Sequence, residues 1–213
     1  PGKTRLAIEV GGEQLDRVRD GVWLVDLAPL ADPDLVPRAI ADVLGLRVEP
    51  NQPLLSVLEQ YMRPRETLLI LDNCEHLIDA VASLIDRLLT ECQDLRVLVT
   101  SREPLNVDGE SIYRVPTLSL PVMNHARDLG AIAQADAVQF FVARARLVAA
   151  DFTLRSENAE LVAELCRRLD GIPLALELAA ARLTTLSLEQ VVERLADRFR
   201  LLTVGSRTAL PRQ

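Results

Sequence analysis

The stretch TLLILDNCEHL, residues 67–77, decides the fold class of this chain. It begins with a nearly continuous apolar run, and the run ends on an acid, Asp72. A strand buried on both faces of a parallel sheet has this pattern, because helices cover both of its sides. Asp72 then stands at the carboxyl end of the strand, where α/β proteins place their ligand sites. The stretch therefore predicts an α/β fold and a candidate site at Asp72.

Strand-like runs and helical patterns alternate through the first half of the chain. GVWLVDLAPL (21–30) and LRVLVTSR (95–102) resemble the central stretch, and SIYRVPTLSLP (111–121) predicts one more strand. Helical patterns cover residues 33–46, 53–62 and 77–92; Asp32 and Pro33 are suited to start the first of them and Gly45 to end it. This alternation predicts a parallel sheet with helices on both faces.

The strand signal disappears from about residue 134. ADAVQFFVARARLVAA, NAELVAELCRRL, PLALELAAARL and SLEQVVERLADRF are four amphipathic helical segments, and the tail LTVGSRTALPRQ is polar and without periodicity. We expect an α/β domain over 1–125, a small helical domain over 126–198, and a linker over 199–213.

Composition and charge exclude several classes of function. The net charge of −7 and the pI of about 5.0 argue against direct nucleic-acid binding by this segment, which needs a basic face. The three cysteines are widely spaced and form no CxxC pattern, which favours reduced cytosolic thiols over a zinc site. No apolar run approaches the length of a membrane span. We expect a cytoplasmic protein that contacts no membrane.

The chain opens with PGKTRLAIEV, in which Gly2, Lys3 and Thr4 form a GKT tripeptide before a helical pattern. In a phosphate-binding loop, backbone N–H groups hold phosphates, the Lys reaches the β- and γ-phosphates, and the Thr hydroxyl binds Mg²⁺. Alone, the tripeptide favours chance, because short GK[ST] strings are common in sequences. Asp72 also has two interpretations, since a strand-terminal Asp can hold Mg²⁺ or simply cap the next helix. The two motifs in this order on alternating elements favour the nucleotide site.

Two further motifs have a structural and a functional interpretation each. In LRVLVTSRE the strand ends in Thr-Ser-Arg, so Arg102 either senses a γ-phosphate or forms a surface pair with Glu103. In RRLDGIPLALELAAARL, Asp170 and Gly171 end one helix and Pro173 begins the next. This corner is either a plain helix–turn–helix or a rigid turn that packs on a nucleotide base.

These motifs together resemble the nucleotide-binding module of STAND-class P-loop ATPases, the class that includes the NB-ARC proteins. The motifs that carry the resemblance are GKTRLA, LLILDNCEHL, LRVLVTSREPL, VPTLSLP and CRRLDGIPLALELAAARL, which span residues 1 to about 198. The motif sequences are most similar to those of the bacterial branch found in LuxR-type and SARP (BTAD)-type transcriptional regulators. The resemblance implies a P-loop sheet, followed by a helical lid domain and then a winged helix.

The resemblance also implies a role for each matching residue. Gly2, Lys3 and Thr4 correspond to the end of Walker A, with Lys3 on the phosphates and Thr4 on Mg²⁺. Asp72 corresponds to the Walker B acid and contributes to Mg²⁺ binding and catalysis. Thr100 and Arg102 correspond to the sensor 1 region, and Pro173 to the proline of the GLPL motif that packs near adenine. Family members bind ADP in a closed form, exchange it for ATP, oligomerise, and reset by slow hydrolysis.

Among the chain's departures from the family pattern, two bear directly on hydrolysis and nucleotide binding. Asn73 stands where many relatives carry a second acid, so hydrolysis is expected to be slow, and Glu75 could substitute. The strand that precedes the P-loop in the family lies centrally in the sheet, and neither it nor the first P-loop glycine is in this sequence. We expect a chain of these residues alone to be unstable and to bind nucleotide poorly.

The sequence therefore predicts an ATP/ADP-binding switch within a cytosolic bacterial transcriptional regulator, with Mg²⁺ as cofactor. Flanking segments would carry DNA-binding and sensor domains, and the ATP state would self-associate. The alternative is an interaction scaffold that keeps the fold without significant turnover, which Asn73 favours. A helicase or loader ATPase is a weaker third reading, because those proteins need basic tracks for nucleic acid and the charge balance here is acidic.

Overall fold

A computed structural model of the 213-residue chain describes residues 2–49, 52–122 and 128–195. The chain divides into two compact units, one over Gly2–Arg114 and a second that begins at Val115. The domain boundary expected at residues 125/126 and the expected linker over 199–213 lie outside the described residues, as do residues 196–198 at the end of the expected helical domain. We describe the two units separately.

The first unit is built on a parallel sheet of three strands in the order β1-β2-β3. These strands are β1 (Val22–Asp26), β2 (Thr67–Asp72) and β3 (Leu95–Val99). Asp26 lies beside Asp72 in the register of β1 and β2, and Leu71 lies beside Val99 in that of β2 and β3. The three strands therefore end at one edge of the sheet, as the strand-like runs predict, and the α/β fold class is confirmed.

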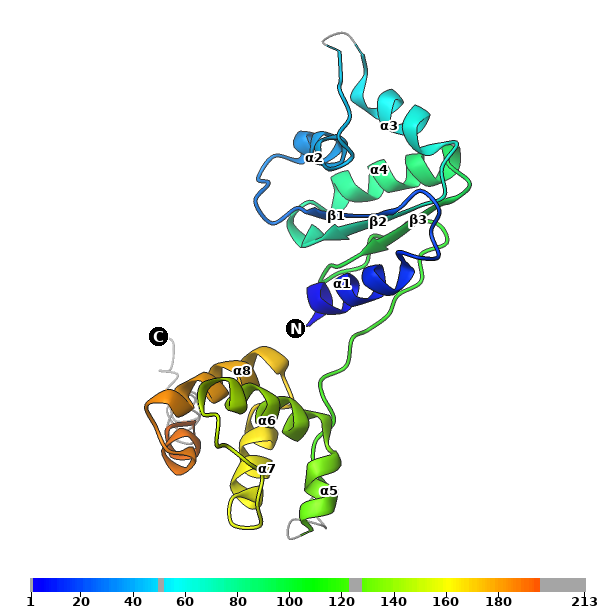
Figure 1. Cartoon of the computed structure of the whole chain (residues 1–213). Helices are drawn as coiled ribbons and strands as arrows, with labels where there is room; N and C mark the ends of the chain where they lie inside the picture. The colour runs from blue at the N-terminus through cyan, green and yellow to red at the C-terminus, as the bar shows by residue number, and fades with distance from the viewer. Residues whose placement is uncertain (1, 50–51, 123–127, 196–213) are drawn as a thin grey trace, which may run out of the picture. The chain divides into compact units, whose positions relative to one another are not determined.

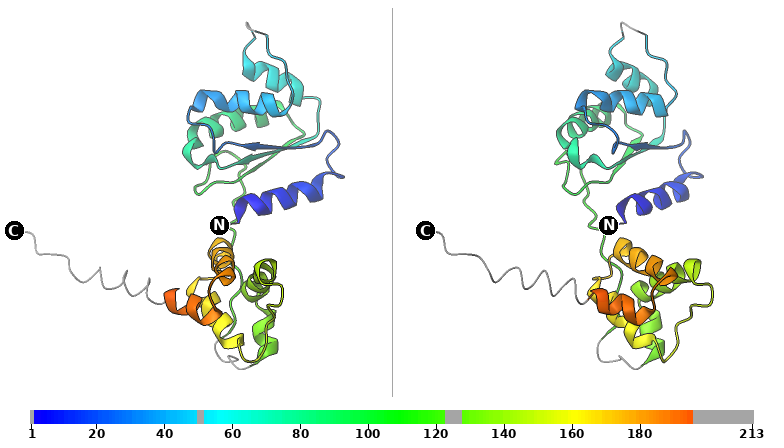
Figure 2. Two further views of the ribbon diagram at one scale, coloured as in Figure 1. Left: turned by 60° about the vertical axis from the view of Figure 1, so that its left-hand side comes forward. Right: turned by 90° about the vertical axis from the view of Figure 1, so that its left-hand side faces the viewer.

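Helices cover both faces of this sheet (Figures 1 and 2). One face carries α1 (Lys3–Gln14), and the other carries α2 (Val36–Val43), α3 (Leu54–Met62) and α4 (Ile78–Glu91). All six residues of β2 are buried, which explains why its sequence is apolar throughout. Its side chains alternate between the two faces, as the pleat of a strand requires.

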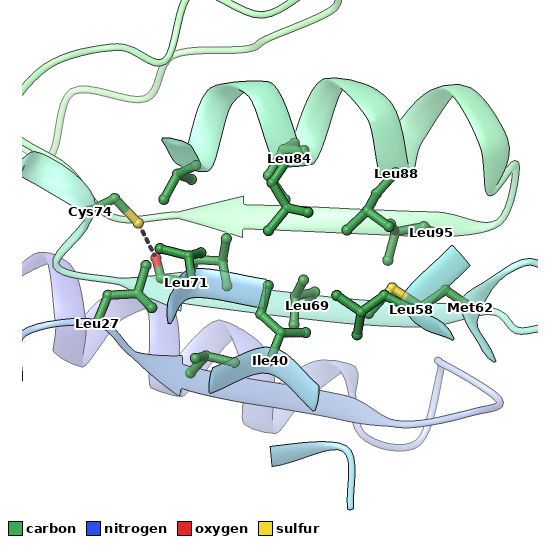
Figure 3. Packing of buried hydrophobic residues seen from close by; sticks show 14 of the residues in the cluster. Leu27, Ile40, Leu58, Met62, Leu69, Leu71, Cys74, Leu84, Leu88 and Leu95 are labelled. Atoms are coloured by element: carbon green, nitrogen blue, oxygen red, sulfur yellow. Dashed lines mark hydrogen bonds between the residues drawn. The ribbon is translucent and has the colours of Figure 1, made fainter. Parts of the chain in front are cut away.

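The larger core lies between the sheet and helices α2 to α4. Leu69 and Leu71 of β2 pack there against Ile40, Leu58 and other apolar side chains (Figure 3). The smaller core, on the other face, joins Leu68 and Ile70 of β2 to Ala7 of α1 and to Val18. Two cores with β2 between them fix the position of α1 and of the strand ends relative to each other.

The expected helix boundaries of the first unit are present. The Asp32 carboxylate accepts a 3.0 Å hydrogen bond from Asp34 N and caps the short helix η1 (Pro33–Leu35), which begins with Pro33. Gly45 follows α2 with a φ of +69°, a left-handed conformation that glycine adopts without steric cost.

Helix α1 lies very close to the sheet at Gly11. A Cβ atom there would lie 2.7 Å from Ile70 Cδ1 and 3.3 Å from Val22 Cγ1. Gly11 is buried, whereas its neighbour Gly12 is exposed with nothing within 4 Å of such a Cβ. Gly11 therefore lets α1 pack directly on the strands, at some cost in helix propensity.

The strand predicted over residues 111–121 is wrong. This stretch contains neither helix nor strand, and hydrogen bonds attach it to the helical unit instead. Leu118 N donates to Gly171 O at 3.0 Å, and Asp136 N donates to Ser119 Oγ at 2.9 Å. In the part of the chain that the structure describes, the sheet ends at β3, which pairs only with β2.

The second unit is helical, as predicted. It contains α5 (Leu129–Gln134), α6 (Asp136–Val148), α7 (Ala159–Arg168), α8 (Pro173–Ala181), the short helix η4 (Arg182–Thr184) and helical residues 188–195. Phe141 lies fully buried in its core, with its ring edge-on to that of Phe152 at a centroid distance of 5.9 Å. The sequence pattern predicts α6, α7, α8 and the helical residues 188–195, but not the short α5.

Candidate functional site

The Asp72 carboxylate at the end of β2 is the centre of the candidate site. The residue is only 3% exposed, and the Thr4 hydroxyl donates a 2.9 Å hydrogen bond to its Oδ1. The hydroxyl of Thr100, the residue after β3, donates to the same oxygen. Two motifs separated by 68 residues thus meet at one carboxylate. Asp72 forms no cap of the following helix, since η2 (Cys74–His76) begins after Asn73 without a side-chain cap.

Asn73 connects Asp72 to the neighbouring strand ends. Its Nδ2 donates to Asp72 Oδ2 at 3.0 Å and to Asp26 Oδ1 at 3.2 Å. Its backbone N–H donates to Thr100 Oγ1 at 3.1 Å. The ends of β1 and β2 and the residue that follows β3 therefore share one hydrogen-bond network.

The N-terminus of α1 lies at the same edge, because Thr4 is in its first turn. Gly2 precedes the helix with a φ of +88°, and no side chain caps the first N–H groups. These N–H groups have no partner within the helix, so they can bind an anion. Lys3 forms no ion pair with any residue that the structure describes.

Glu75 and Arg102 form an ion pair beside this network. Arg102 Nε lies 2.9 Å from Glu75 Oε1, and their side chains are 78% and 27% exposed respectively. Arg102 therefore pairs with Glu75 rather than with Glu103, the surface partner considered from the sequence. In this structure each side chain of the pair satisfies the charge of the other.

Cys74 is buried within the site, and its thiol is unreactive. Burial, together with the nearby charges of Asp72 and Glu75, raises the pKa of its thiol to about 12. A thiol with this pKa carries almost no thiolate at neutral pH, so it is no nucleophile. Its backbone N–H donates to Thr100 O at 3.0 Å, which holds the turn after β2 against the end of β3.

Pro173 belongs to the second unit, where it is the first residue of α8. The turn before it contains Asp170 and Gly171, with φ of +52° and +63°. A Cβ at Gly171 would lie 2.3 Å from Leu118 O, so this position has room only for glycine. The turn thus binds the chain segment at Leu118 in its own unit. The structure brings together Gly2, Lys3, Thr4, Asp72, Glu75, Thr100 and Arg102 in the first unit and places Pro173 in the second.

Asp26 is the residue of this network that sequence reasoning missed. Its carboxylate accepts hydrogen bonds from Asn73 Nδ2 and, at 2.9 Å, from Ala28 N. A signal for it is present in the sequence, because VWLVD ends an apolar run on an acid in the same way as TLLILD. Two neighbouring parallel strands that both end on an acid place those acids at one edge.

The described residues contain no group of three or more His, Cys, Asp or Glu side chains arranged to hold a metal ion. Nor does any helix within the described ranges have the length and apolarity that crossing a membrane requires. No protein-family profile matches the chain.

Similar proteins are found in mycobacteria. The chain is 42% identical, over 212 residues, to two proteins that carry the provisional name HTH-type transcriptional regulator, one from Mycobacterium tuberculosis strain H37Rv and one from Mycobacterium bovis. This match covers 100% of the chain and 22% of each relative. It is also 42% identical, over 209 residues, to an uncharacterized protein of Mycobacterium tuberculosis strain H37Rv, covering 98% of the chain and 50% of that protein. The chain thus spans half or less of the length of these relatives.

Proposed function

We propose that this chain is a nucleotide-binding switch module that binds ATP and ADP with Mg²⁺. The observation that carries the proposal is the hydrogen bond between Thr4 and Asp72. The sequence names these two residues from separate motifs, and a P-loop site requires their side chains to be adjacent. A chance GKT tripeptide has no reason to lie against an acid at the end of a buried strand.

The residues around α1 suit the phosphates of a nucleotide. Gly2 has a backbone conformation that glycine tolerates, and the N–H groups of the first helical turn have no side-chain cap. A helix N-terminus favours negative charge, and the Lys3 ammonium adds a full positive charge beside it. We assign the phosphates to Gly2, Lys3 and Thr4.

The donor set beside them suits Mg²⁺. This ion prefers oxygen ligands and is usually held by one or two carboxylates together with substrate phosphates and water. The Thr4 hydroxyl and the Asp72 carboxylate supply oxygens of this kind at one point. Thr4 and Asp72 would hold the ion, which would supply charge stabilisation at the phosphates when bound.

Slow turnover fits the state of Glu75 and Arg102. Glu75 is the acid available to orient water, and Arg102 is the cation available to the γ-phosphate, yet the two are paired with each other. Both must separate before either can act. We infer that ATP hydrolysis is slow, and that the identity of the bound nucleotide, ATP or ADP, sets the state of the switch.

A transcriptional context is supported by the relatives. Two of them carry the provisional name HTH-type transcriptional regulator and extend well beyond the matched segment. We infer that this chain serves a cytosolic regulator in which neighbouring segments bind DNA and sense a signal. Pro173 would then contribute to the adenine pocket and Thr100 to nucleotide sensing. Self-association in the ATP state is part of the same proposal.

A second candidate function is an interaction scaffold without turnover. Asn73 at the position of a second acid, together with the pairing of Glu75, favours the scaffold.

Nucleotide binding by the full-length protein, measured by calorimetry with ADP and with Mg²⁺-ATP, tests the switch. The Lys3→Ala substitution should abolish this binding. Phosphate release, with Glu75→Gln as the control, then separates a slow ATPase from a scaffold. Nucleotide binding by Lys3→Ala at the wild-type affinity would reject the switch.

A further inference from the structure

The side chain of Asn73 forms hydrogen bonds to the last residues of two neighbouring strands, β1 and β2. Its amide nitrogen donates to Asp26 at 3.2 Å and to Asp72 at 3.0 Å, which uses both hydrogens of the amide. An acid at this position could not donate either bond. It would also add a third carboxylate beside two others, and like charges at this separation repel.

The backbone conformation of Asn73 allows these two hydrogen bonds. Its φ is +62°, in the left-handed region that asparagine enters more readily than most residues. This conformation turns the chain sharply after β2, and the side chain then contacts the end of β1. The backbone N–H is simultaneously hydrogen-bonded to the Thr100 hydroxyl.

The two oxygens of Asp72 consequently have different partners. Oδ2 accepts from Asn73, while Oδ1 accepts from the hydroxyls of Thr4 and Thr100. The amide therefore fixes which oxygen is directed to Thr4. Asp26 fixes the amide in turn, and Ala28 N holds the Asp26 carboxylate at 2.9 Å.

We propose that Asn73 is a positioning residue of the nucleotide site, anchored by Asp26, that orients the Asp72 carboxylate toward Thr4 and the Mg²⁺ ion. This inference rests on the proposed function. It also assigns a role to Asn73 other than a lost catalytic acid, and it adds Asp26 to the site. Partners that orient a metal ligand commonly matter for affinity almost as much as the ligand itself.

The test is the Mg²⁺ dependence of ATP binding by the full-length protein, measured by calorimetry. Asn73→Gly keeps the left-handed backbone and removes the amide, and Asp26→Ala removes the anchor. Each should raise the Mg²⁺ concentration for half-maximal ATP binding about tenfold. ADP binding in EDTA should stay unchanged. Asp26→Asn keeps an acceptor oxygen, so its Mg²⁺ requirement should stay close to that of the wild type.

Two controls make the result specific. Asp86→Ala removes an exposed acid of α4 and should behave as the wild type. The double variant Asn73→Gly with Asp26→Ala should be no worse than either single variant, because the two residues act in sequence. The positioning role is overturned if Asp26→Ala matches Asp86→Ala, or if the two effects add. Absence of nucleotide binding by the wild type would overturn the proposed function and this role together, whereas unchanged Mg²⁺ dependence in a binding-competent variant overturns this role alone.

Discussion

The Thr4 hydroxyl donates a 2.9 Å hydrogen bond to the Asp72 carboxylate, although the two residues lie 68 positions apart. Thr4 is in the first turn of α1 and Asp72 is the last residue of β2. The smaller core, with Ala7 of α1 against Leu68 and Ile70 of β2, holds the two elements together. Packing on one face of the sheet therefore positions the polar contact at its edge.

The packing at Gly11 predicts opposite effects for two adjacent substitutions. Gly12→Ala should raise the free energy of unfolding by about 0.5–1 kcal/mol, because it improves helix propensity on an open surface. Gly11→Ala gains the same propensity but places a methyl group 2.7 Å from Ile70 Cδ1 in a packed core. Ile70 Cδ1, the end of a flexible side chain, must shift to admit the methyl group, so this variant should be the less stable of the two. Urea denaturation measures both, and equal stability of the two variants would contradict the close approach.

The turn at Gly171 should be intolerant of any side chain. Gly171→Ala would combine a left-handed backbone with a Cβ 2.3 Å from Leu118 O, whereas Gly45→Ala meets the left-handed backbone alone. The Gly45 variant should lose about 1–2 kcal/mol of stability, and the Gly171 variant clearly more. Chemical denaturation followed by circular dichroism compares them. A Gly171 loss no larger than that of Gly45 would argue against the contact with Leu118.

The three cysteines should be protected in the folded protein. All three thiols are buried; burial raises the pKa of Cys74 and Cys166 to about 12 and also raises that of Cys92. Iodoacetamide at pH 8 should therefore label them only after denaturation, as mass spectrometry can show. Rapid labelling of the native protein would contradict this burial.

The same thiols predict a loss of stability in alkali. An unfolded thiol ionises near its ordinary pKa of 9.0, whereas folded Cys74 and Cys166 stay protonated up to about 12. A group whose pKa is raised by folding stabilises the native state below the unfolded pKa and loses this contribution as the pH rises. The free energy of unfolding should fall between pH 9 and 12. Cys74→Ala with Cys166→Ala should flatten that fall.

The pairing of Glu75 with Arg102 should matter for nucleotide discrimination and little for stability. Exposed ion pairs contribute about 0–1 kcal/mol, and Arg102 is largely exposed, so Glu75→Gln should leave the midpoint of unfolding nearly unchanged. The same change frees Arg102 for the γ-phosphate. The ratio of ATP to ADP affinity in calorimetry should therefore rise. An unchanged ratio would show that the pair does not restrain Arg102.

The elements that the sequence predicts are those whose signal is local. TLLILD is buried on both faces in the structure as its apolar run requires, and Asp32, Gly45 and Pro173 occupy the helix boundaries that their conformational preferences favour. SIYRVPTLSLP, by contrast, is not a strand in the structure. Its hydrogen bonds go to Gly171 and Asp136, which no local pattern foretells.

The site divides in the same way. Thr4, Asp72 and Thr100 are recognisable because each lies at or next to the end of an element, within a motif that the sequence shows. The role of Asn73 depends on Asp26, which comes from a strand 47 residues away, and on a left-handed backbone. Likewise, the partner of Arg102 is Glu75 across the strand ends rather than its neighbour Glu103. Contacts between side chains at the ends of different strands depend on the order of the strands in the sheet, which the sequence does not state directly.

Nucleotide binding measures the central claim most directly. The full-length protein, its Lys3→Ala variant and its Thr4→Val variant should be titrated with ADP and with Mg²⁺-ATP by isothermal calorimetry. The account predicts saturable binding by the wild type, loss of binding in Lys3→Ala, and loss of the Mg²⁺-dependent part in Thr4→Val, whose methyl cannot donate to Asp72. Wild-type affinity in both variants, or no binding by the full-length protein, would contradict it.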